Sequence, residues 1–351
     1  MTKAVYFVPV EKKFFHKWEY YIVDLDMLQN TFSEVIVCHN NLEFCKALLL
    51  NKIDLVYCWW WHQSAFPITL SRVLKIPSYT TGAVHMYDES GCQDFFSKGF
   101  VYRALLKFSW RFSSVNLFIS KSQFRQITSH VKVNQPIVLQ SSLSVNYNPV
   151  NLDTNVTHAE EPPTIKLLTV LWMTKDTIAR KSIYEILDAL ALCVQERVTN
   201  FQWTIAGIKG DGSADLEERI ITLRLQNFIN ILYDVSTESK EELFQSSDLY
   251  LQPSYYEGFG NAVLEAMSFG LPALVSRNTA QAEVIGNSGL MVEEIDAPSI
   301  SAAVIKFINL THEERQKHRN LVSDTINERH LFQHRLKKFK KILSKYQHNS
   351  N

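Results

Sequence analysis

Short apolar segments alternate with longer amphipathic segments along most of the chain. In the first half, the short apolar segments are 4–10, 34–38, 54–59, 77–82, 115–120 and 136–140. In the second half, they are 165–172, 203–207, 229–233, 249–254, 272–276 and 290–292. Segments of this length are typical of buried strands, and the longer amphipathic segments are typical of helices. The alternation predicts an α/β fold with parallel sheets and crossover helices.

A polar stretch interrupts this alternation between 146 and 163. Its sequence, NYNPVNLDTNVTHAEEPP, is rich in Asn, Pro and acidic residues and lacks periodicity, which is typical of an interdomain linker. The chain of 351 residues also exceeds the roughly 250 to 300 at which one hydrophobic core stops growing. We therefore predict two doubly wound, Rossmann-like domains that face one cleft. Their predicted bounds are 1–150 and 164–328, with a linker over 151–163 and a C-terminal helix and tail over 329–351.

The tail from 331 to 346 has apolar residues at helical spacing and a basic opposite face without an acidic residue. The basic residues are Arg335, Lys337, Lys338, Lys340, Lys341 and Lys345. We predict a final helix whose basic face is solvated.

The composition excludes several classes of function. Acidic and basic side chains are equal in number, 36 each, which argues against nucleic acid as the main partner. The five cysteines lack CxxC spacing, so we expect free, mostly buried thiols in a reducing compartment. The first apolar segment stops at Glu11, unlike a signal peptide, and no apolar run approaches the roughly 18 residues of a membrane span. We expect a cytoplasmic protein that is soluble or at most peripheral to a membrane.

The segment YYEGFGNAVLEAMSFGLP, at 255–272, places Glu257 and Glu265 eight positions apart. Gly258 and Gly260 allow a sharp turn beside a ligand, and 261–269 can begin a helix whose unpaired amides point at an anion. At about 100° per residue, two helical positions eight apart differ by only ~80°, so both carboxylates can face one cleft. The arrangement suits a nucleotide sugar, because sugar and ribose hydroxyls need acceptors and a diphosphate needs donors.

The spacing within EGFGNAVLE resembles the donor-site signature of retaining GT-B glycosyltransferases of family four. The resemblance extends from about 165 to 307 and includes ARKSIYEILDAL, FQWTIAG, SSDLYLQPSYYEGFGN, GLPALVS and EVIGNSGLMV. An isolated pair of glutamates at this spacing is more often a solvated helix surface, but the ordered neighbouring motifs favour the family. The resemblance implies a GT-B fold, in which a C-terminal helix crosses back to the N-terminal domain.

The resemblance also implies roles for individual residues. Glu257 would bind hydroxyls of the transferred sugar, Glu265 would bind the ribose, and Gly207 matches the glycine where the chain turns beside the nucleotide. The backbone amides that would approach the sugar or the diphosphate are those of Phe259, Gly260 and Asn261. Lys181 matches the family lysine that binds the diphosphate, with Ser182 in place of the following glycine.

A cation at this place would stabilise the leaving group as it gains negative charge. Arg180 is the substitute for Lys181 if the alignment slips by one, and the alternative to both is an exposed lysine at a helix start. The family's Gly-Arg pair after the first strand of this domain is replaced by Leu171 and Trp172. Arg180, Lys175 or Lys209 can supply the missing cation, with weaker phosphate binding as the alternative. We expect Trp172 to lie in the core, with stacking on a ligand ring as the alternative.

The first domain carries fewer signals. The segment TTGAVHMYDE brings His85 to the edge of the cleft, where the family often has a histidine near the reacting sugar. His85 can bind the donor or orient the acceptor; Asp88 is a weaker candidate, and His62 competes for the role. The family's glycine-rich loop after the first strand is absent, and a loop that we expect to be solvated replaces it. That loop contains Lys12, Lys13, His16 and Lys17.

The segment 95–125 has six basic residues, no acidic residue and interleaved aromatic residues. A basic aromatic helix of this kind can lie on an anionic membrane. We therefore consider peripheral membrane contact through 95–125, with ordinary core packing and basic stems that reach into solvent as the alternative.

The resemblance implies a reaction in which a sugar moves from a UDP or GDP sugar to a hydroxyl of a glycan or lipid-linked glycan, with retention, in surface polysaccharide assembly. We predict no metal requirement and no other cofactor, with cations on the protein doing the work of a divalent ion. The motif DLD at 24–26 resembles a metal-binding Asp-x-Asp, but it lies early in the chain and in a predicted helix. Two alternatives stay open: a catalytically weak subunit that binds a partner enzyme, and a GT-B nucleotide-sugar epimerase. The expected location is the cytoplasm, either free in solution or at the inner face of the cell membrane.

Overall fold

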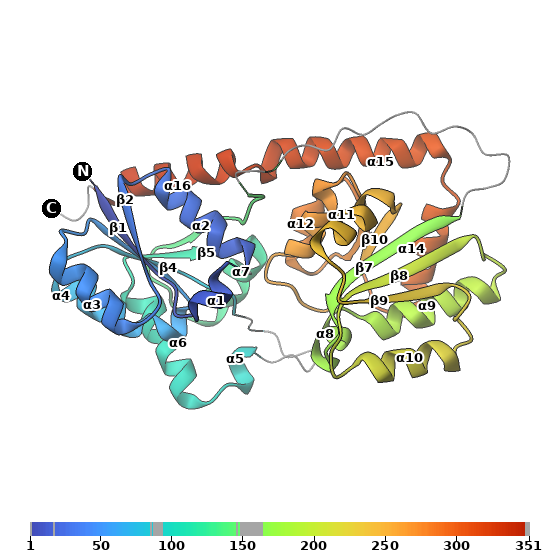
Figure 1. Cartoon of the computed structure of the whole chain (residues 1–351), viewed down its shortest axis with the longest axis horizontal. Coiled ribbons are helices and arrows are strands. Elements are labelled where there is room, and N and C mark those ends of the chain that lie inside the picture. Colours follow the sequence, from blue (N-terminus) through green and yellow to red (C-terminus); the bar gives the residue numbers. More distant parts are fainter. Residues whose placement is uncertain are drawn as a thin grey trace. The chain divides into compact units, whose positions relative to one another are not determined.

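A computed structural model describes residues 2–16, 18–84, 86, 94–144, 147 and 164–347. The chain divides into two compact units (Figure 1). Unit 1 comprises 1–147 and 329–351, and unit 2 comprises 148–328. Each unit contains one parallel six-stranded sheet with helices packed on it. The predicted α/β fold with two Rossmann-like halves is therefore confirmed.

The sheet of unit 1 has the strand order β2-β1-β3-β4-β5-β6, and every neighbouring pair is parallel. Its strands are β1 (Lys3–Phe7), β2 (Glu34–Cys38), β3 (Leu55–Trp59), β4 (Ser78–Thr81), β5 (Val115–Phe118) and β6 (Pro136–Val138). Its helices are α1 (Lys12–Phe15), α2 (Glu19–Gln29), α3 (Asn41–Leu50), the 3₁₀ helix η1 (Trp61–Gln63), α4 (Ala65–Val73), α5 (Asp94–Ser97), α6 (Phe100–Phe112), α7 (Lys121–His130) and α16 (Phe332–Gln347). Each strand lies within one of the predicted apolar segments or overlaps it.

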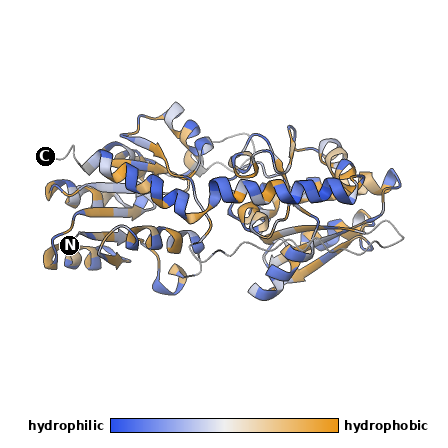
Figure 2. Ribbon diagram, turned by 90° about the horizontal axis from the view of Figure 1, so that it is seen from above, coloured by the Kyte–Doolittle hydropathy of each residue, from blue (hydrophilic) through white to orange (hydrophobic). Residues whose placement is uncertain are grey.

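The sheet of unit 2 has the order β12-β11-β10-β7-β8-β9 and is also parallel. Its strands are β7 (Ile165–Trp172), β8 (Phe201–Ile208), β9 (Ile229–Tyr233), β10 (Leu249–Gln252), β11 (Ala273–Ser276) and β12 (Leu290–Val292). Its helices are α8 (Lys175–Arg180), α9 (Ile183–Gln195), α10 (Ser213–Thr222), α11 (Thr237–Ser246), α12 (Asn261–Ser268), α13 (Ala280–Ile285), α14 (Ala297–Ile308) and α15 (His312–Thr325). A π-helical segment, Ile326–His330, follows α15. In Figure 2 the strands are mostly hydrophobic, whereas α15 is mostly hydrophilic.

The C-terminal helix α16 packs on unit 1, as predicted for this fold. Phe332, Leu336 and Phe339 are buried in the same core as β1 and β3. The ring of Phe339 meets those of Tyr57 and Tyr79 edge to face, at centroid distances of 6.1 and 6.3 Å. The apolar stripe of the tail therefore completes the core of unit 1.

Arg335 contradicts the prediction that the whole basic face of the tail is solvated. Its side chain is buried, and its Nη2 atom lies 2.5 Å from Oδ1 of Asp24 on α2. The other carboxylate oxygen of Asp24 accepts hydrogen bonds from the Tyr57 hydroxyl at 2.8 Å and from Nε1 of Trp59 at 2.7 Å. Burial of this arginine is tolerated because a carboxylate and backbone carbonyls pair with it. The motif DLD lies on a helix, as predicted, and Asp24 serves structure there.

The segment 95–125 does not form one basic aromatic helix. It contains the end of α5, all of α6, strand β5 and the start of α7. Phe95, Trp110 and Phe118 are buried in one cluster, so part of its aromatic content belongs to the core, as the alternative reading held. Phe100 and Val101 are exposed. Within the described part of the chain, no helix is long and apolar enough to cross a membrane.

Four cysteines lie in the described ranges as free thiols. Cys38, Cys58 and Cys193 are buried, and Cys45 is half-buried. The expectation of free, mostly buried thiols is confirmed for these four, while Cys92 lies outside the described residues.

Candidate functional site

The strand order of unit 2 reverses between β7 and β10, which lie side by side. In open α/β sheets, ligands bind at such a switch point, beyond the carboxyl ends of the strands. The connection that follows β7 contains Lys181, and the loop that follows β10 contains Glu257. The amide of Tyr255 donates to the carbonyl of Arg180 at 3.0 Å, so the two connections are in direct contact. The two motifs that the sequence analysis singled out therefore meet at one edge of the sheet.

Lys181 lies in the turn between α8 and α9, and its side chain is buried, with only 6% of the residue exposed. Its Nζ atom donates to Oε1 of Gln252 at 2.8 Å and to the carbonyl of Val170 at 3.1 Å. The alternative of an exposed lysine at a helix start is therefore wrong. Its ammonium group is held between the ends of β7 and β10, where it faces the signature loop.

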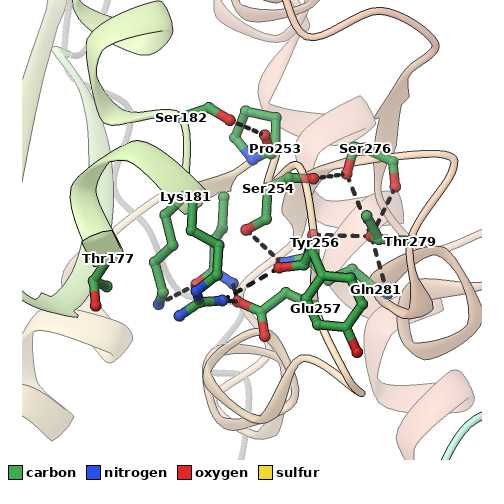
Figure 3. A network of polar contacts seen from close by, with 12 residues as sticks. Thr177, Lys181, Ser182, Pro253, Ser254, Tyr256, Glu257, Ser276, Thr279 and Gln281 are labelled. Carbon is green, nitrogen blue, oxygen red and sulfur yellow. Dashed lines mark hydrogen bonds and ion pairs between the residues drawn. The ribbon is translucent and has the colours of Figure 1, made fainter. Parts of the chain in front are cut away.

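Ser182 explains how the chain turns at this point. Its φ of 56° lies in the left-handed region that favours glycine, which the family pattern has here. The Ser182 hydroxyl donates to the carbonyl of Pro253, at 2.8 Å, and does not cap α9 (Figure 3). This hydrogen bond ties the lysine turn to the loop after β10.

The electrostatic environment of Lys181 makes it easier to deprotonate than an ordinary lysine. The pKa of its ammonium group is lowered from 10.5 to about 8, mainly by burial; Arg180 contributes to this shift, while Glu257 and Glu265 oppose it. Removal of a charge from water is costly, and the nearby carboxylates recover only part of that cost. Both glutamates of the signature therefore act on the same ammonium group.

We predict that activity falls as pH rises through about 8. The free protein loses the Lys181 proton near that pH, because its pKa is depressed to about 8. If the ammonium group acts on the donor, kcat/KM should fall about tenfold per pH unit above this value. The lowered pKa also affects folding. Between about pH 8 and 10.5 the unfolded chain binds more protons at Lys181 than the folded chain does, so the free energy of unfolding rises with pH over this range. A kcat/KM profile that stays flat to pH 10 would exclude this role.

Glu257 is positioned by two partners. Its Oε1 atom lies 2.7 Å from Nη1 of Arg180 and accepts a hydrogen bond from Nε2 of Gln252 at 3.1 Å. Nη1 of Arg180 also donates to the carbonyl of Tyr256 at 3.2 Å. Gln252 thus bridges Lys181 and Glu257, and the Tyr250 hydroxyl lies 3.1 Å from the same Gln252 oxygen.

Glu265 lies on α12, where it is half-buried and forms an ion pair with Lys240 of α11. Gly258 is half-buried, Phe259 and Gly260 are buried, and Asn261 is exposed at the first position of α12. The predicted order of turn, helix start and second carboxylate is therefore present. The assigned roles of these residues in donor binding stay predictions.

Gly260 has a φ of 103°, and a Cβ atom there would lie 2.9 Å from Cγ of Gln281. Gln281 is buried, and its Nε2 atom donates to the Ser254 hydroxyl at 3.4 Å. The Ser276 hydroxyl donates to the Ser254 carbonyl at 2.5 Å, and Oγ1 of Thr279 lies 3.2 Å from Oε1 of Gln281 (Figure 3). These buried polar contacts fix the signature loop to β11 and α13. Sequence reasoning missed them, because a short polar residue near a strand end carries no signal of its partner.

Gly207 lies at the end of β8, opposite Leu171 of β7, with a φ of 142°. A Cβ atom at this position would lie 1.9 Å from the Leu171 carbonyl oxygen. The position therefore requires glycine for backbone packing at the edge of the sheet where the candidate site lies.

We predict that Gly207→Ala destabilises unit 2 by about 3 kcal/mol or more, because the methyl group forces the two strands apart and the backbone is strained. Gly99→Ala is the matched control, since a Cβ atom at Gly99 meets nothing within 4 Å. Denaturant unfolding followed by circular dichroism compares the two variants. Equal midpoints for both would contradict the prediction.

Of the three cations considered as substitutes for the family arginine, Arg180 alone forms an ion pair with the signature loop. Nζ of Lys175 lies 2.9 Å from Oδ2 of Asp215, and Nζ of Lys209 lies 5.0 Å from the ring centroid of Tyr233. Trp172 is 53% exposed, so the expectation of a core tryptophan is wrong. Trp172 is the last residue of β7, at the edge of the sheet where Lys181 also lies.

The candidates of the first domain are less well defined. His85, Asp88 and Lys17 lie outside the described residues. His62 is half-buried in η1, where burial and, to a lesser extent, Lys98 lower the pKa of its imidazole. Lys12 and Lys13 are exposed and form surface ion pairs with Glu43 and Glu11. Among the residues that the structure describes, no three His, Cys, Asp or Glu side chains gather as a metal site would require.

Comparison with known proteins finds a family match within unit 2. Residues 169–322, nearly all of the described part of unit 2, match the family model described as "Glycosyl transferases group 1". Unit 2 therefore resembles the group 1 glycosyltransferases over this range, and the resemblance noted in the signature is confirmed.

Individual relatives match over part of their length. The chain is 32% identical to O-antigen chain mannosyltransferase B of Escherichia coli over 127 aligned residues. The alignment covers 36% of this chain and 33% of that protein. It is 22% identical over 239 residues to the capsular polysaccharide biosynthesis glycosyltransferase CapM of Staphylococcus aureus. That alignment covers 66% of this chain and 62% of CapM. The chain thus spans less than two thirds of the length of these curated relatives.

Solved structures match over almost the whole chain. Anabaena HepE in complex with UDP has a TM-score of 0.74 at 14% identity and covers 98% of this chain and 100% of that one. The apo form of the lipopolysaccharide outer core galactosyltransferase WaaB has a TM-score of 0.69 at 15% identity, with 98% and 100% covered. At such identities the likeness shows the fold alone, which is the GT-B fold.

Proposed function

We propose that this protein transfers a sugar from a UDP or GDP sugar to a hydroxyl of a glycan or lipid-linked glycan, with retention at the anomeric carbon. The observation that supports this most is the buried ammonium group of Lys181, which hydrogen-bonds to Gln252 beside the carboxylate of Glu257. A buried cation next to a carboxylate, at the switch point of a parallel sheet, suits a ligand that carries both phosphate and hydroxyl groups.

Each group has a part in the proposed reaction. Lys181 and the amino end of α12 stabilise the negative charge that the diphosphate gains as the glycosidic bond breaks. Glu257 accepts hydrogen bonds from the sugar hydroxyls, and Glu265 accepts them from the ribose. Arg180, which pairs with Glu257, is placed to turn toward the diphosphate and so to replace the family arginine.

The proton of the acceptor hydroxyl passes to the departing phosphate on the same face of the sugar. This step depends on the position of the reacting groups, and no enzymic nucleophile is needed. Protein cations do the work of a divalent ion, so we propose a metal-independent reaction without a further cofactor. The names of the relatives support a role in surface polysaccharide assembly. The proposed location is the cytoplasmic face of the cell membrane.

The test is an assay of nucleotide release with a panel of UDP and GDP sugars, with and without glycan acceptors. Glu257→Ala should lower kcat/KM by about 100-fold or more, because the sugar hydroxyls lose an ionised acceptor in the transition state. Glu283→Ala, which changes a half-buried glutamate of α13, is the matched control.

Each outcome of this assay favours one function. Acceptor-dependent release that Glu257→Ala abolishes supports transfer. Acceptor-independent release at the full rate would favour a nucleotide-sugar epimerase that hydrolyses its donor. Neither binding nor release with any donor would favour a catalytically weak subunit of a partner enzyme.

A further inference from the structure

Three neighbouring helices of unit 1 expose large apolar side chains. Helix α4 packs against both α3 and α6 (Figure 1). The exposed residues are Leu42, Leu49 and Leu50 on α3, Phe66 and Val73 on α4, and Phe100 and Val101 on α6. Leu49 is 84% exposed, and Phe100 is 78% exposed. Single exposed apolar residues are ordinary, but their concentration on adjacent helices marks an interaction surface.

An open groove of about 460 Å³ lies between α4 and α6 within this surface. Its lining includes Phe66, Phe100, Val101, Leu105 and Phe108, and Thr69 is its one polar lining residue. The residues of α6 recur at intervals of three and four, so they form one stripe. The opposite stripe of α6 contains Leu106 and Trp110, which are buried in the core. Helix α6 is thus apolar on two faces, and the core covers one of them.

The two helices that line the groove carry basic residues and no acidic residue. The sequences of α4 and α6 contain Arg72, Arg103, Lys107 and Arg111 and no acidic residue. The guanidinium groups of Arg72 and Arg111 lie over the ring of Phe112, at 5.3 and 5.7 Å from its centroid. Two cations are thereby held beside an aromatic ring at the C-terminal end of α6. That charge pattern complements an apolar phase that carries negative charge at its boundary.

We propose that the surface formed by α3, α4 and α6 docks on a bilayer that contains anionic lipid. Phe66, Phe100 and Val101 enter the boundary between headgroups and acyl chains, and the basic residues of α4 and α6 bind lipid phosphates. A lipid surface accepts apolar side chains without requiring the matched polar groups that a protein partner would present. The proposal concerns unit 1 and does not depend on the proposed donor site in unit 2.

The test is flotation of the purified full chain with vesicles of phosphatidylcholine alone and of phosphatidylcholine with phosphatidylglycerol. We expect flotation with the anionic vesicles and its loss as salt rises from 50 to 500 mM, roughly a threefold shortening of the screening length. Reversal of two basic residues, Lys107→Glu and Arg111→Glu, should lower the partition coefficient roughly 25-fold or more. Phe100→Ser with Val101→Ser should lower it by about tenfold or more.

Controls with matched chemistry lie on unit 2. Lys306→Glu with Lys317→Glu removes the same charge, and Ile221→Ser removes an exposed apolar side chain; neither should change flotation. Nucleotide binding should be unchanged in all variants, so failure of the membrane proposal and failure of the proposed function are distinguishable. The proposal is overturned if wild type does not float with anionic vesicles, or if the unit 1 variants float as wild type does. It is also overturned if light scattering shows that the α4 and α6 substitutions dissociate a dimer while flotation persists.

Discussion

Replacement of Lys181 by methionine is expected to lower kcat/KM for sugar transfer by about 100- to 1000-fold. Methionine has a similar length but carries no charge, so the diphosphate leaving group loses its nearest buried cation. The effect should exceed that of any exposed lysine, because the Lys181 ammonium group is buried. Charges interact more strongly in the protein interior than in water. Steady-state kinetics with the best donor of the panel measures it.

The folded structure should survive this substitution. Methionine avoids the cost of a buried charge, and the Tyr250 hydroxyl can donate to one of the two oxygens that Lys181 leaves. The Tyr250 hydroxyl lies 3.1 Å from Oε1 of Gln252 and 3.2 Å from the Val170 carbonyl. A melting temperature within a few degrees of wild type would show that the loss of activity is chemical.

Lys175→Met tests the competing assignment of the missing cation. Lys175 is exposed, and its ammonium group pairs with Asp215. If Arg180 and Lys181 serve the diphosphate, this variant should retain kcat/KM within about threefold, as expected for a surface ion pair. A larger loss for Lys175→Met than for Lys181→Met would reverse the assignment.

Arg335→Met is expected to destabilise unit 1 by about 3 to 5 kcal/mol. The substitution leaves the Asp24 carboxylate buried without its cationic partner, which is the costly way to break a buried ion pair. It also removes the donor to the Leu139 carbonyl, at 2.8 Å. Calorimetry resolves the unfolding of unit 1 from that of unit 2 if the two melt separately.

A double-mutant cycle isolates the ion pair. Asp24→Asn keeps the shape of the side chain and removes the charge, and Asp24→Asn with Arg335→Met removes both charges. We expect the double variant to be more stable than the sum of the single effects by about 1 to 3 kcal/mol. Additive effects would show that Asp24 and Arg335 stabilise the protein independently. Lys337→Met, at an exposed position of the same helix, should change stability by less than about 0.5 kcal/mol.

The fold could be predicted from the sequence because buried parallel strands are near-continuous apolar runs. The segments 165–172 and 229–233 became β7 and β9 with unchanged bounds. Glu257 and Glu265 carried a family spacing, and Lys181 lay in a second motif of the same family. The sequence therefore predicted which residues of unit 2 are candidates for the site.

The sequence did not predict the burial of Arg335, the exposure of Trp172 or the role of Gln252. These errors have a common physical cause, because the burial and contacts of a side chain depend on residues distant in the chain. Arg335 is buried because Asp24, 311 residues away, accepts its hydrogen bonds. Trp172 is the last residue of the strand β7, and its side chain is nonetheless 53% exposed. Gln252 connects Lys181 to Glu257, a role visible only when β7 and β10 are adjacent. Local pattern carries none of this information.

The central claim, that the Lys181 ammonium group binds a diphosphate, is tested most directly by calorimetric titration of UDP and GDP at pH 8.5 in buffers of different ionisation enthalpy. Free Lys181 has a pKa of about 8 and is mostly neutral at that pH, whereas a bound diphosphate would keep it charged. We predict one-site binding of UDP or GDP with uptake of about half a proton to one proton, which vanishes in Lys181→Met. Binding without proton uptake, or uptake that persists in Lys181→Met, would contradict the claim.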